Sequence, residues 1–478
     1  MELIANFQTN KNSIAEFARI MIPEAIDEAI VLNAEESGEG IEMRAVRGNN
    51  TAFFSYRNLG FLVEDQKSTM IKILLLRLYG KRHPWGSLTG VRPTKLMKRF
   101  FLNGCSAGEI RDIFENFYQV SEEKAALLLE VVQKEMALLN PEAMNVYIGI
   151  PFCPTKCSYC SFASYELSGG VGRYYRDFLE TLREEIRMAG NMLKEDRFKV
   201  ESIYIGGGTP GILGEDELKD LLKNVRDNVE NRFLKEFTFE AGREDTLTEE
   251  KLRILKDFGV GRISLNPQTF KEATLLKINR KFDREHFDKM YELAKEMNFL
   301  VNMDFIIGLP YEYTEDVLYT LEELEQYDPD NLTIHALAFK RRARLFQGNK
   351  ERNPLDRVAI EERIRDLTGR KGLRPYYLYR QKNLIDWGEN TGYARKGTES
   401  LFNMEMIEEN QCTLGLGGGA ITKLITKKEH NRDFVQRFIN PKDPALYIRE
   451  MRARTAEKLE KLKLWSLQRQ ERTTSAPM

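Results

Sequence analysis

From residue 146 onward, short apolar runs alternate with charged segments of helical spacing. Six runs have the length and composition of β-strands, at 146–150, 202–205, 236–240, 262–265, 300–307 and 332–336. The segments that follow the runs with helical spacing are at 174–193, 215–229, 248–258, 284–297 and 314–326. Strands that alternate with helices predict a parallel sheet or barrel with the helices outside. Because six units are fewer than the eight of a closed barrel, we expect an α/β fold with a partial (β/α)6 barrel.

The pattern changes on both sides of this core. Before it, strand-like runs at 29–33, 41–46 and 52–56 precede helical segments at 66–79, 106–117 and 121–139. This order indicates an N-terminal α+β domain, and the irregular pattern after the sixth run indicates a mixed C-terminal extension. We therefore expect an α+β domain at 1–141, the core at 142–340, a region that covers the substrate at 341–440 and a charged helical tail at 441–478, solvated and frayed at its end.

Composition excludes several classes of protein. The chain has 478 residues, 73 acidic and 72 basic side chains and 42% apolar residues, which fits neither a disordered, a collagenous nor a disulfide-framework protein. The segment 1–10 lacks the pattern of a secretory signal. The richest apolar run, 71–78, is far shorter than the roughly 20 residues that a bilayer requires. We expect a cytoplasmic globular protein without a membrane partner.

The strongest chemical signal is a cysteine motif directly after the first core strand. Cys153, Cys157 and Cys160 have the spacing C-x3-C-x2-C, and Pro151 and Pro154 prevent the segment from continuing as a helix. Three soft sulfur donors without a fourth nearby suit a [4Fe-4S] cluster with one iron that the protein leaves unligated. Two alternatives stay open here: zinc held by three cysteines and water, and a chance grouping of thiols.

The cysteine motif resembles the cluster loop of radical S-adenosylmethionine (SAM) enzymes. In that superfamily SAM chelates the open iron, and its reductive cleavage yields a 5'-deoxyadenosyl radical that abstracts hydrogen. Tyr147, the Ile150-Pro151-Phe152-Cys153 entry and Tyr159 are similar to the oxygen-independent coproporphyrinogen III oxidase (coproporphyrinogen dehydrogenase) branch. The segment 86–93 and the long N-terminal zone resemble its HemZ-type members.

The resemblance implies the residues that bind the cofactors. The cluster ligands would be Cys153, Cys157 and Cys160. The residues at positions that contact SAM in the family are Tyr147, Tyr159, Gly207, Gly208, Thr209, Glu240, Gln268, Arg280, Asp304, Ala338 and Ile421. In the family these positions divide between two SAM molecules. This chain departs from the family in having Ala241-Gly242-Arg243 where a proline often follows the glutamate, and Ser161 where some members have another cysteine.

Two basic segments bear on the substrate. Lys340, Arg341, Arg342 and Arg344 follow the sixth run, and their side chains suit propionate groups because guanidinium pairs with carboxylate in a bidentate manner. The segment 66–108 holds nine Lys or Arg and no acidic residue. It indicates either an anionic partner (a porphyrinogen, an acidic electron carrier or RNA) or a basic surface without a partner.

As a function, the resemblance implies an oxidoreductase that decarboxylates coproporphyrinogen III to protoporphyrinogen IX without oxygen, in porphyrin and haem biosynthesis. A flavodoxin- or ferredoxin-type electron donor is expected, and a nucleic-acid partner is not. The alternatives are a haem-binding chaperone of the same family and a methyltransferase or haem-degrading relative. The chaperones carry a His-Asn pair where this chain reads Glu389-Asn390.

Overall fold

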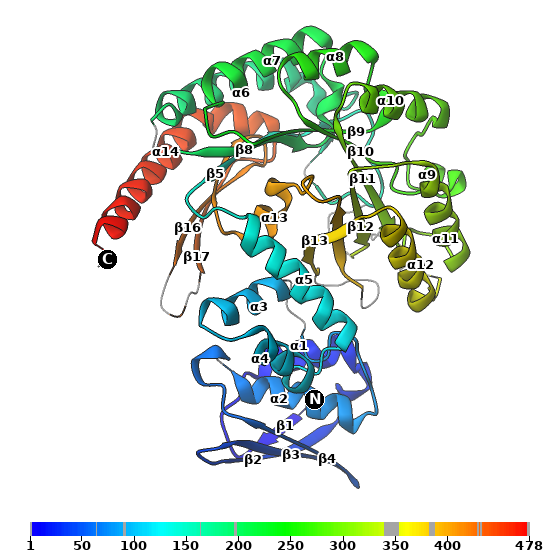
Figure 1. Ribbon diagram of the computed structural model, residues 1–478, viewed down its shortest axis with the longest axis vertical. Helices are drawn as coiled ribbons and strands as arrows, with labels where there is room; N and C mark the ends of the chain where they lie inside the picture. The colour runs from blue at the N-terminus through cyan, green and yellow to red at the C-terminus, as the bar shows by residue number, and fades with distance from the viewer. Residues whose placement is uncertain are drawn as a thin grey trace. The chain divides into compact units, whose positions relative to one another are not determined.

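The computed structural model describes residues 2–63, 65–88, 92–162, 164–195, 198–338, 353–381, 388–427, 430 and 433–475 (Figure 1). The chain divides into two compact units. The first comprises Met1–Met136, Leu378–Glu389 and Lys427–Arg432, and the second comprises Ala137–Tyr377, Asn390–Thr426 and Asp433–Met478. The division gives the first unit two short segments from late in the chain.

The second unit is built on six parallel strands that follow one another in space as in sequence. They are β5 (Met144–Ile150), β8 (Val200–Gly207), β9 (Glu236–Gly242), β10 (Arg262–Leu265), β11 (Leu300–Ile307) and β12 (Asn331–Ala336). The intervening helices cover the outer face in Figure 1; they are α6 (Tyr175–Leu193), α7 (Glu215–Asn228), α8 (Glu249–Asp257), α9 (Glu272–Lys277), α10 (Arg284–Glu296) and α11 (Thr314–Glu323). The predicted α/β fold with six strand-helix units is confirmed.

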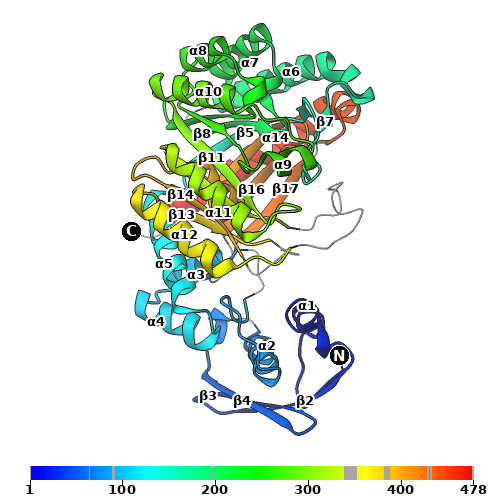
Figure 2. The ribbon, with the colours of Figure 1, turned by 90° about the vertical axis from the view of Figure 1, so that its right-hand side faces the viewer.

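The C-terminal region extends this sheet on both sides. β15 (Cys412–Gly417) pairs parallel with β5 and continues into β16 (Ile421–Lys427) and β17 (Asp433–Ile439). On the other side β14 (Asn390–Ala394) runs antiparallel to β12, and β13 (Arg374–Tyr379) forms the outer strand. α12 (Arg357–Arg370) packs beside α11, as Figure 2 shows. These strands make the mixed extension that the sequence predicted.

The two faces of the parallel strands differ in polarity. One face is apolar and packs with the outer helices in a large core that includes Val146, Ile203, Phe239, Ile263 and Val301. Because side chains alternate along a strand, the polar residues face the other way. They are Asn145, Tyr147, Ser202, Tyr204, Glu236, Thr238, Glu240, Arg262, Ser264, Asn302, Asp304, Asn331, Thr333 and His335. An inner face so rich in polar groups differs from the apolar side-chain layers of a packed barrel core, and we call this polar face of the parallel strands the chamber.

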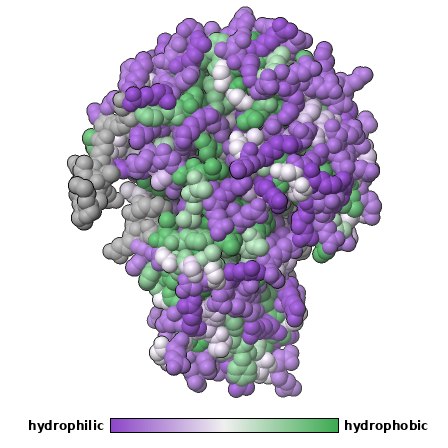
Figure 3. Space-filling view, in the orientation of Figure 1, coloured by the Kyte–Doolittle hydropathy of each residue, from purple (hydrophilic) through white to green (hydrophobic). Residues whose placement is uncertain are grey.

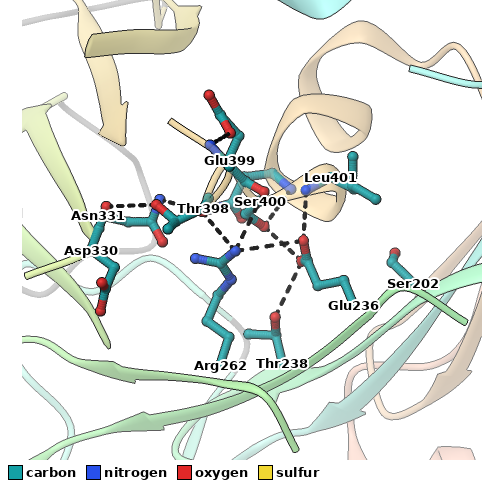
Figure 4. A network of polar contacts seen from close by, with 12 residues as sticks. Ser202, Glu236, Thr238, Arg262, Asp330, Asn331, Thr398, Glu399, Ser400 and Leu401 are labelled. Atoms are coloured by element: carbon teal, nitrogen blue, oxygen red, sulfur yellow. Dashed lines mark hydrogen bonds and ion pairs between the residues drawn. The ribbon is translucent and has the colours of Figure 1, made fainter. Parts of the chain in front are cut away.

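A polar network closes the amino-terminal end of this chamber (Figure 4). The Glu236 carboxylate accepts hydrogen bonds from the Ser400 hydroxyl at 2.8 Å and from the backbone N–H of Leu401 at 2.7 Å. Arg262 donates to the Thr398 carbonyl at 2.8 Å. These bonds fix the start of α13 (Leu401–Glu408) under the strands, and its Phe402 stacks on Tyr204 with ring centroids 4.4 Å apart.

The last helix, α14 (Pro444–Ser475), packs along α6. It buries one face, with Tyr447, Met451, Thr455, Lys458 and Leu462 at helical spacing. The sequence predicted a solvated, frayed helix because charged residues dominate this stretch. The structure differs because the few apolar residues and Lys458 share one stripe.

The first unit combines a four-stranded sheet with a helical layer. Its sheet order is β1 (Glu2–Ala5), β2 (Ala29–Glu36), β3 (Gly40–Arg47) and β4 (Asn50–Arg57), with β1 parallel to β2. Its helices are α1 (Lys11–Met21), α2 (Gln66–Leu78), α3 (Pro93–Leu102), α4 (Ala107–Asp112) and α5 (Glu122–Leu138). Within the described ranges of both units, short helical turns lie at Pro23–Ala25, Gly60–Leu62, Ile113–Phe117, Gly170–Tyr174, Pro210–Ile212, Glu244–Thr246 and Leu324–Gln326.

The basic segment 66–108 does not form a continuous free surface. Lys67 pairs with Glu36 and Lys81 with Glu24, while Arg99 donates to the Leu62 carbonyl at 2.7 Å. Hydrophilic side chains cover much of the face drawn in Figure 3, with apolar patches between them. Among the described residues, no helix is both long and apolar enough to cross a membrane.

Candidate active site

The cysteine loop lies at the carboxyl end of the first parallel strand, where functional groups gather in such folds. Cys153 ends the two-residue strand β6 (Phe152–Cys153), which pairs with β7 (Tyr165–Glu166). Cys153 and Cys157 are buried and Cys160 is partly exposed. The Cys160 N–H donates to the Cys157 carbonyl at 3.1 Å, which curls the loop, and the Thr209 hydroxyl donates to the Cys153 sulfur at 3.4 Å.

The spacing and burial of the three thiols bear on what they can bind. Among the described residues, no three His, Cys, Asp or Glu side chains meet as they would around one metal ion. The thiolates of a four-iron cluster bind separate irons and so stand farther apart than the ligands of one ion. Burial raises the pKa of Cys153 to about 11 and raises the pKa of Cys160 as well, so the metal-free loop holds thiols that release protons when a cluster binds.

The glycine-rich segment after β8 lies directly against the cysteine loop. The Gly208 N–H donates to the Ile150 carbonyl and the Thr209 N–H to the Phe152 carbonyl, both at 2.8 Å. A Cβ atom on Gly208 would stand 2.4 Å from the Phe152 carbonyl oxygen, and Gly207 has a φ of +118°. Only glycine permits this approach and this backbone angle. The segment therefore fixes the strand that leads into the cysteines.

Two carboxylates, Glu240 at the end of β9 and Asp304 in β11, influence each other across the chamber. Burial, followed by repulsion from Asp304, raises the pKa of Glu240 to about 8. Burial also opposes ionisation of Asp304, yet its pKa is lowered, because the His335 ring lies 3.9 Å away and Asn302 donates a hydrogen bond to it at 2.8 Å. His335 in turn lies 3.2 Å from the Asn390 side-chain oxygen. One carboxyl is thus held protonated and the other ionised at neutral pH.

Gln268 lies in the loop after β10, and Arg280 lies in the loop after α9. Gln268 has a φ of +70°, unusual for a residue with a side chain, and its N–H donates to the Asp304 carbonyl at 3.0 Å. Its side-chain oxygen is buried and has no hydrogen-bond partner among the described residues. Arg280 donates to the Gly242 carbonyl at 3.0 Å and lies beside Tyr159 and Cys157. An unsatisfied buried oxygen on a strained residue is a candidate ligand contact.

The remaining predicted residues lie near the same end of the strands or outside the described residues. Tyr147 stacks on Tyr204 and Phe402 inside the chamber. Ala338 follows β12, and Ile421 begins β16, where its backbone lies against Gly415. Lys340, Arg341, Arg342 and Arg344 lie outside the described residues.

Several polar groups of the chamber were not anticipated from the sequence. Tyr204, Asn266 and Asn390 belong to it: Asn266 accepts the Asp304 N–H at 3.2 Å, and burial raises the pKa of Tyr204. The signal that could have identified Tyr204 is the alternation of polar and apolar residues within 200–207. Asn390 carries no such signal, because the antiparallel pairing of β14 with β12 brings it to His335.

Known proteins resemble this chain in both sequence and structure. The model of the radical SAM superfamily matches residues 147–324. The oxygen-independent coproporphyrinogen-III oxidase-like protein HemZ of Bacillus subtilis is 36% identical over 464 residues, which cover 94% of this chain and 90% of HemZ. The heme chaperone HemW of the same organism is 28% identical over 58% of this chain and 70% of its own length.

A solved structure supports the fold. The coproporphyrinogen III oxidase HemN from Escherichia coli superposes with a TM-score of 0.52 at 20% identity, covering 68% of this chain and 73% of HemN. The likeness extends beyond the parallel strands, since it covers two thirds of the chain. The match to HemZ covers nearly the full length of both proteins. The chain therefore belongs to the radical SAM superfamily and, within it, to the HemZ-like members of the oxygen-independent coproporphyrinogen III oxidase family.

Proposed function

We propose that the protein is an oxidoreductase that converts coproporphyrinogen III to protoporphyrinogen IX without oxygen, in the cytoplasm. The observation that carries the proposal is the gathering of the cysteine loop, the glycine segment and the unequal carboxyl pair at one end of a polar chamber. The chain resembles HemN, which is named a coproporphyrinogen III oxidase, and HemZ, which is named an oxygen-independent coproporphyrinogen-III oxidase-like protein.

In this proposal Cys153, Cys157 and Cys160 hold a [4Fe-4S] cluster. The residues that we propose to bind SAM are Tyr147, Tyr159, Gly207, Gly208, Thr209, Glu240, Gln268, Arg280, Asp304, Ala338 and Ile421. Cluster and SAM together supply hydrogen-abstracting radical chemistry. Two SAM molecules would match two propionates, since each propionate becomes a vinyl group by losing one hydrogen atom, one electron and CO2.

The protein's own part is binding, orientation and exclusion of water. Ionised Asp304 attracts the positive charges of SAM, and a cation near Glu240 would lower its pKa and favour its carboxylate form. The N–H groups of Gly208 and Thr209 bond to the backbone of Ile150 and Phe152, just before Cys153. A ligand beside this segment would therefore contact a backbone that is already fixed. The hydrogen bonds of Glu236 and Arg262 occupy the amino-terminal end of the chamber, and we expect them to limit the entry of water there.

The proposal is tested by product analysis under anaerobic conditions. Reconstituted protein, SAM, dithionite and coproporphyrinogen III as the sole acceptor should give 5'-deoxyadenosine, CO2 and vinyl product. Cys157→Ser should lose iron and all turnover, whereas Cys412→Ser, at a buried cysteine of β15, should keep its iron. SAM cleavage without any change of the porphyrinogen would refute this substrate.

A haem-binding chaperone is the second candidate, supported by the match to HemW and by a His–Asn contact that the sequence did not foretell. His335 and Asn390 meet at the carboxyl end of β12. Titration with haem distinguishes the two functions. A stable, stoichiometric Soret shift that His335→Ala abolishes, without vinyl product, would favour the chaperone.

A further inference from the structure

We propose that the outer surface of the cysteine loop and α9 docks a small acidic electron-carrier protein of the flavodoxin type. The proposal rests on the proposed function, because only a redox cluster at the cysteine loop needs such a donor. We call this region the α9 surface and define it by Lys156, Phe162, Leu276, Lys277, Lys281 and Tyr311.

Hydrogen bonds attach α9 to the cysteine loop. The backbone N–H of Ser158 donates to the Ile278 carbonyl at 2.9 Å, and the Asn279 side chain donates to the Lys156 carbonyl at 3.1 Å. Both loop residues lie between Cys153 and Cys160. The end of α9 therefore lies directly beside the ligand-bearing loop, and a protein bound there comes close to the cysteines.

Large apolar side chains are exposed on α9, beside its end and just after the last cysteine of the loop. Leu276 is 70% exposed, Phe162 68% and Tyr311 61%, and they are among the most exposed large apolar residues described. Phe162 follows Cys160 by two residues, and Lys277 lies over the Tyr311 ring at 4.2 Å. Exposed aromatic and aliphatic groups beside charges are typical of a protein–protein interface.

The charges of the α9 surface indicate the kind of partner. Lys156, Lys277 and Lys281 form no ion pair within the part of the chain that the structure describes, whereas Lys271 at the start of α9 is paired with Asp316 at 2.7 Å. The backbone N–H of Lys156 donates to the Glu166 carboxylate at 3.0 Å, but none of the three ammonium groups is in an ion pair among the described residues. Three such lysines beside exposed apolar side chains are complementary to an acidic protein face. Steering by such charges also raises the rate of encounter.

The redox step at this surface is the transfer of a single electron. One electron leaves the reduced carrier, which is oxidised by one electron, and reaches the cluster, which is reduced by one; no atom is transferred. Cys160 is the partly exposed member of the three cysteines. It is followed directly by Ser161 and the exposed Phe162, so this loop connects the surface with one of the sulfur atoms.

The test compares charge reversals on matched exposed lysines. Lys277→Glu/Lys281→Glu should weaken the binding of reduced flavodoxin at least about tenfold at low salt, measured as a Kd by calorimetry. It should also slow flavodoxin-driven SAM cleavage and leave dithionite-driven cleavage and iron content unchanged. Lys194→Glu/Lys289→Glu, at two exposed lysines at the end of α6 and on α10, should alter neither.

The apolar part is tested separately with Leu276→Ser, which should weaken flavodoxin binding without changing the salt dependence that the lysines confer. Equal Kd values for wild-type protein, the Lys277/Lys281 double variant and Leu276→Ser would overturn the docking surface. Failure of the wild-type protein to cleave SAM with dithionite would instead overturn the proposed function, and the Kd comparison would still decide on the surface.

Discussion

At the scale of single residues, the unequal carboxyl pair determines how the chamber responds to pH. Glu240 takes up a proton on folding, because its pKa rises to about 8 through burial and the nearby Asp304. The folded state then binds more protons than the unfolded state between the ordinary pKa of a glutamate and about 8. Stability contributed by protonated Glu240 is full below this window and is lost as the pH rises through it.

We therefore expect Glu240→Gln to remove part of the pH dependence of the metal- and SAM-free protein. Between about pH 6 and pH 8 the wild-type protein should lose about 1–2 kcal/mol of unfolding free energy relative to the variant, since one pKa unit corresponds to about 1.4 kcal/mol. Urea denaturation at both pH values measures the difference. A constant difference across this range would show that Glu240 is ionised in the folded protein.

At the scale of elements, a buried ion pair attaches α14 to the sheet. Glu185 of α6 accepts hydrogen bonds from the Tyr447 hydroxyl and the Gly417 N–H, both at 2.6 Å, and pairs with Lys458. Lys458 also donates to the Gly415 carbonyl at 2.7 Å. Three segments that are far apart in the chain thus meet at one carboxylate.

Removing one partner of this pair should cost much more than removing a surface pair. Lys458→Met leaves the buried Glu185 charge uncompensated, for which we expect a loss of about 3–5 kcal/mol in urea denaturation. Arg454→Ala, which breaks an exposed pair with Glu450, should cost less than about 1 kcal/mol. If Glu185→Gln/Lys458→Met proved as unstable as Lys458→Met, the uncompensated charge would not be the cause.

The elements show which parts of the fold are readable from sequence. The six core strands and four of the five predicted core helices begin and end within two residues of the prediction, because apolar runs alternate clearly with amphipathic segments. The helix α11 ends three residues earlier than predicted, and the short helix α9 was not predicted. β1 and α1 were missed, since a four-residue terminal strand carries little pattern. The cysteines stand in one short motif and are evident, whereas the contact of Glu185 with Lys458 joins residues 273 positions apart and leaves no local trace.

At the scale of the whole molecule, the first unit is discontinuous in sequence. Glu389 lies inside it: its carboxylate accepts a hydrogen bond from the Trp85 ring N–H at 3.1 Å and pairs with Lys124 at 2.6 Å. Arg380 lies over the Trp85 ring at 5.0 Å. The segment 378–389 therefore supplies charge partners to the helices of the first 136 residues.

We expect a fragment of residues 1–136 to be markedly less stable than the same unit in the full chain. Trp85 is the only tryptophan in this fragment. Its fluorescence during urea unfolding therefore reports on the surroundings of Trp85 in the absence of Glu389. Hydrogen exchange around Trp85 in the full chain gives the reference stability. A fragment that unfolds with the reference free energy would show that the late segment contributes nothing.

This discontinuity sets an order of events during synthesis. After residue 136 leaves the ribosome, about 250 further residues must follow before Glu389 exists, which takes roughly 10–50 s at ordinary elongation rates. During that time residues 1–136 lack Glu389 as a partner. Meanwhile the six parallel strands between residues 144 and 336 emerge and can pair. Of the two units, the one that contains residues 1–136 is thus completed only after most of the other has emerged.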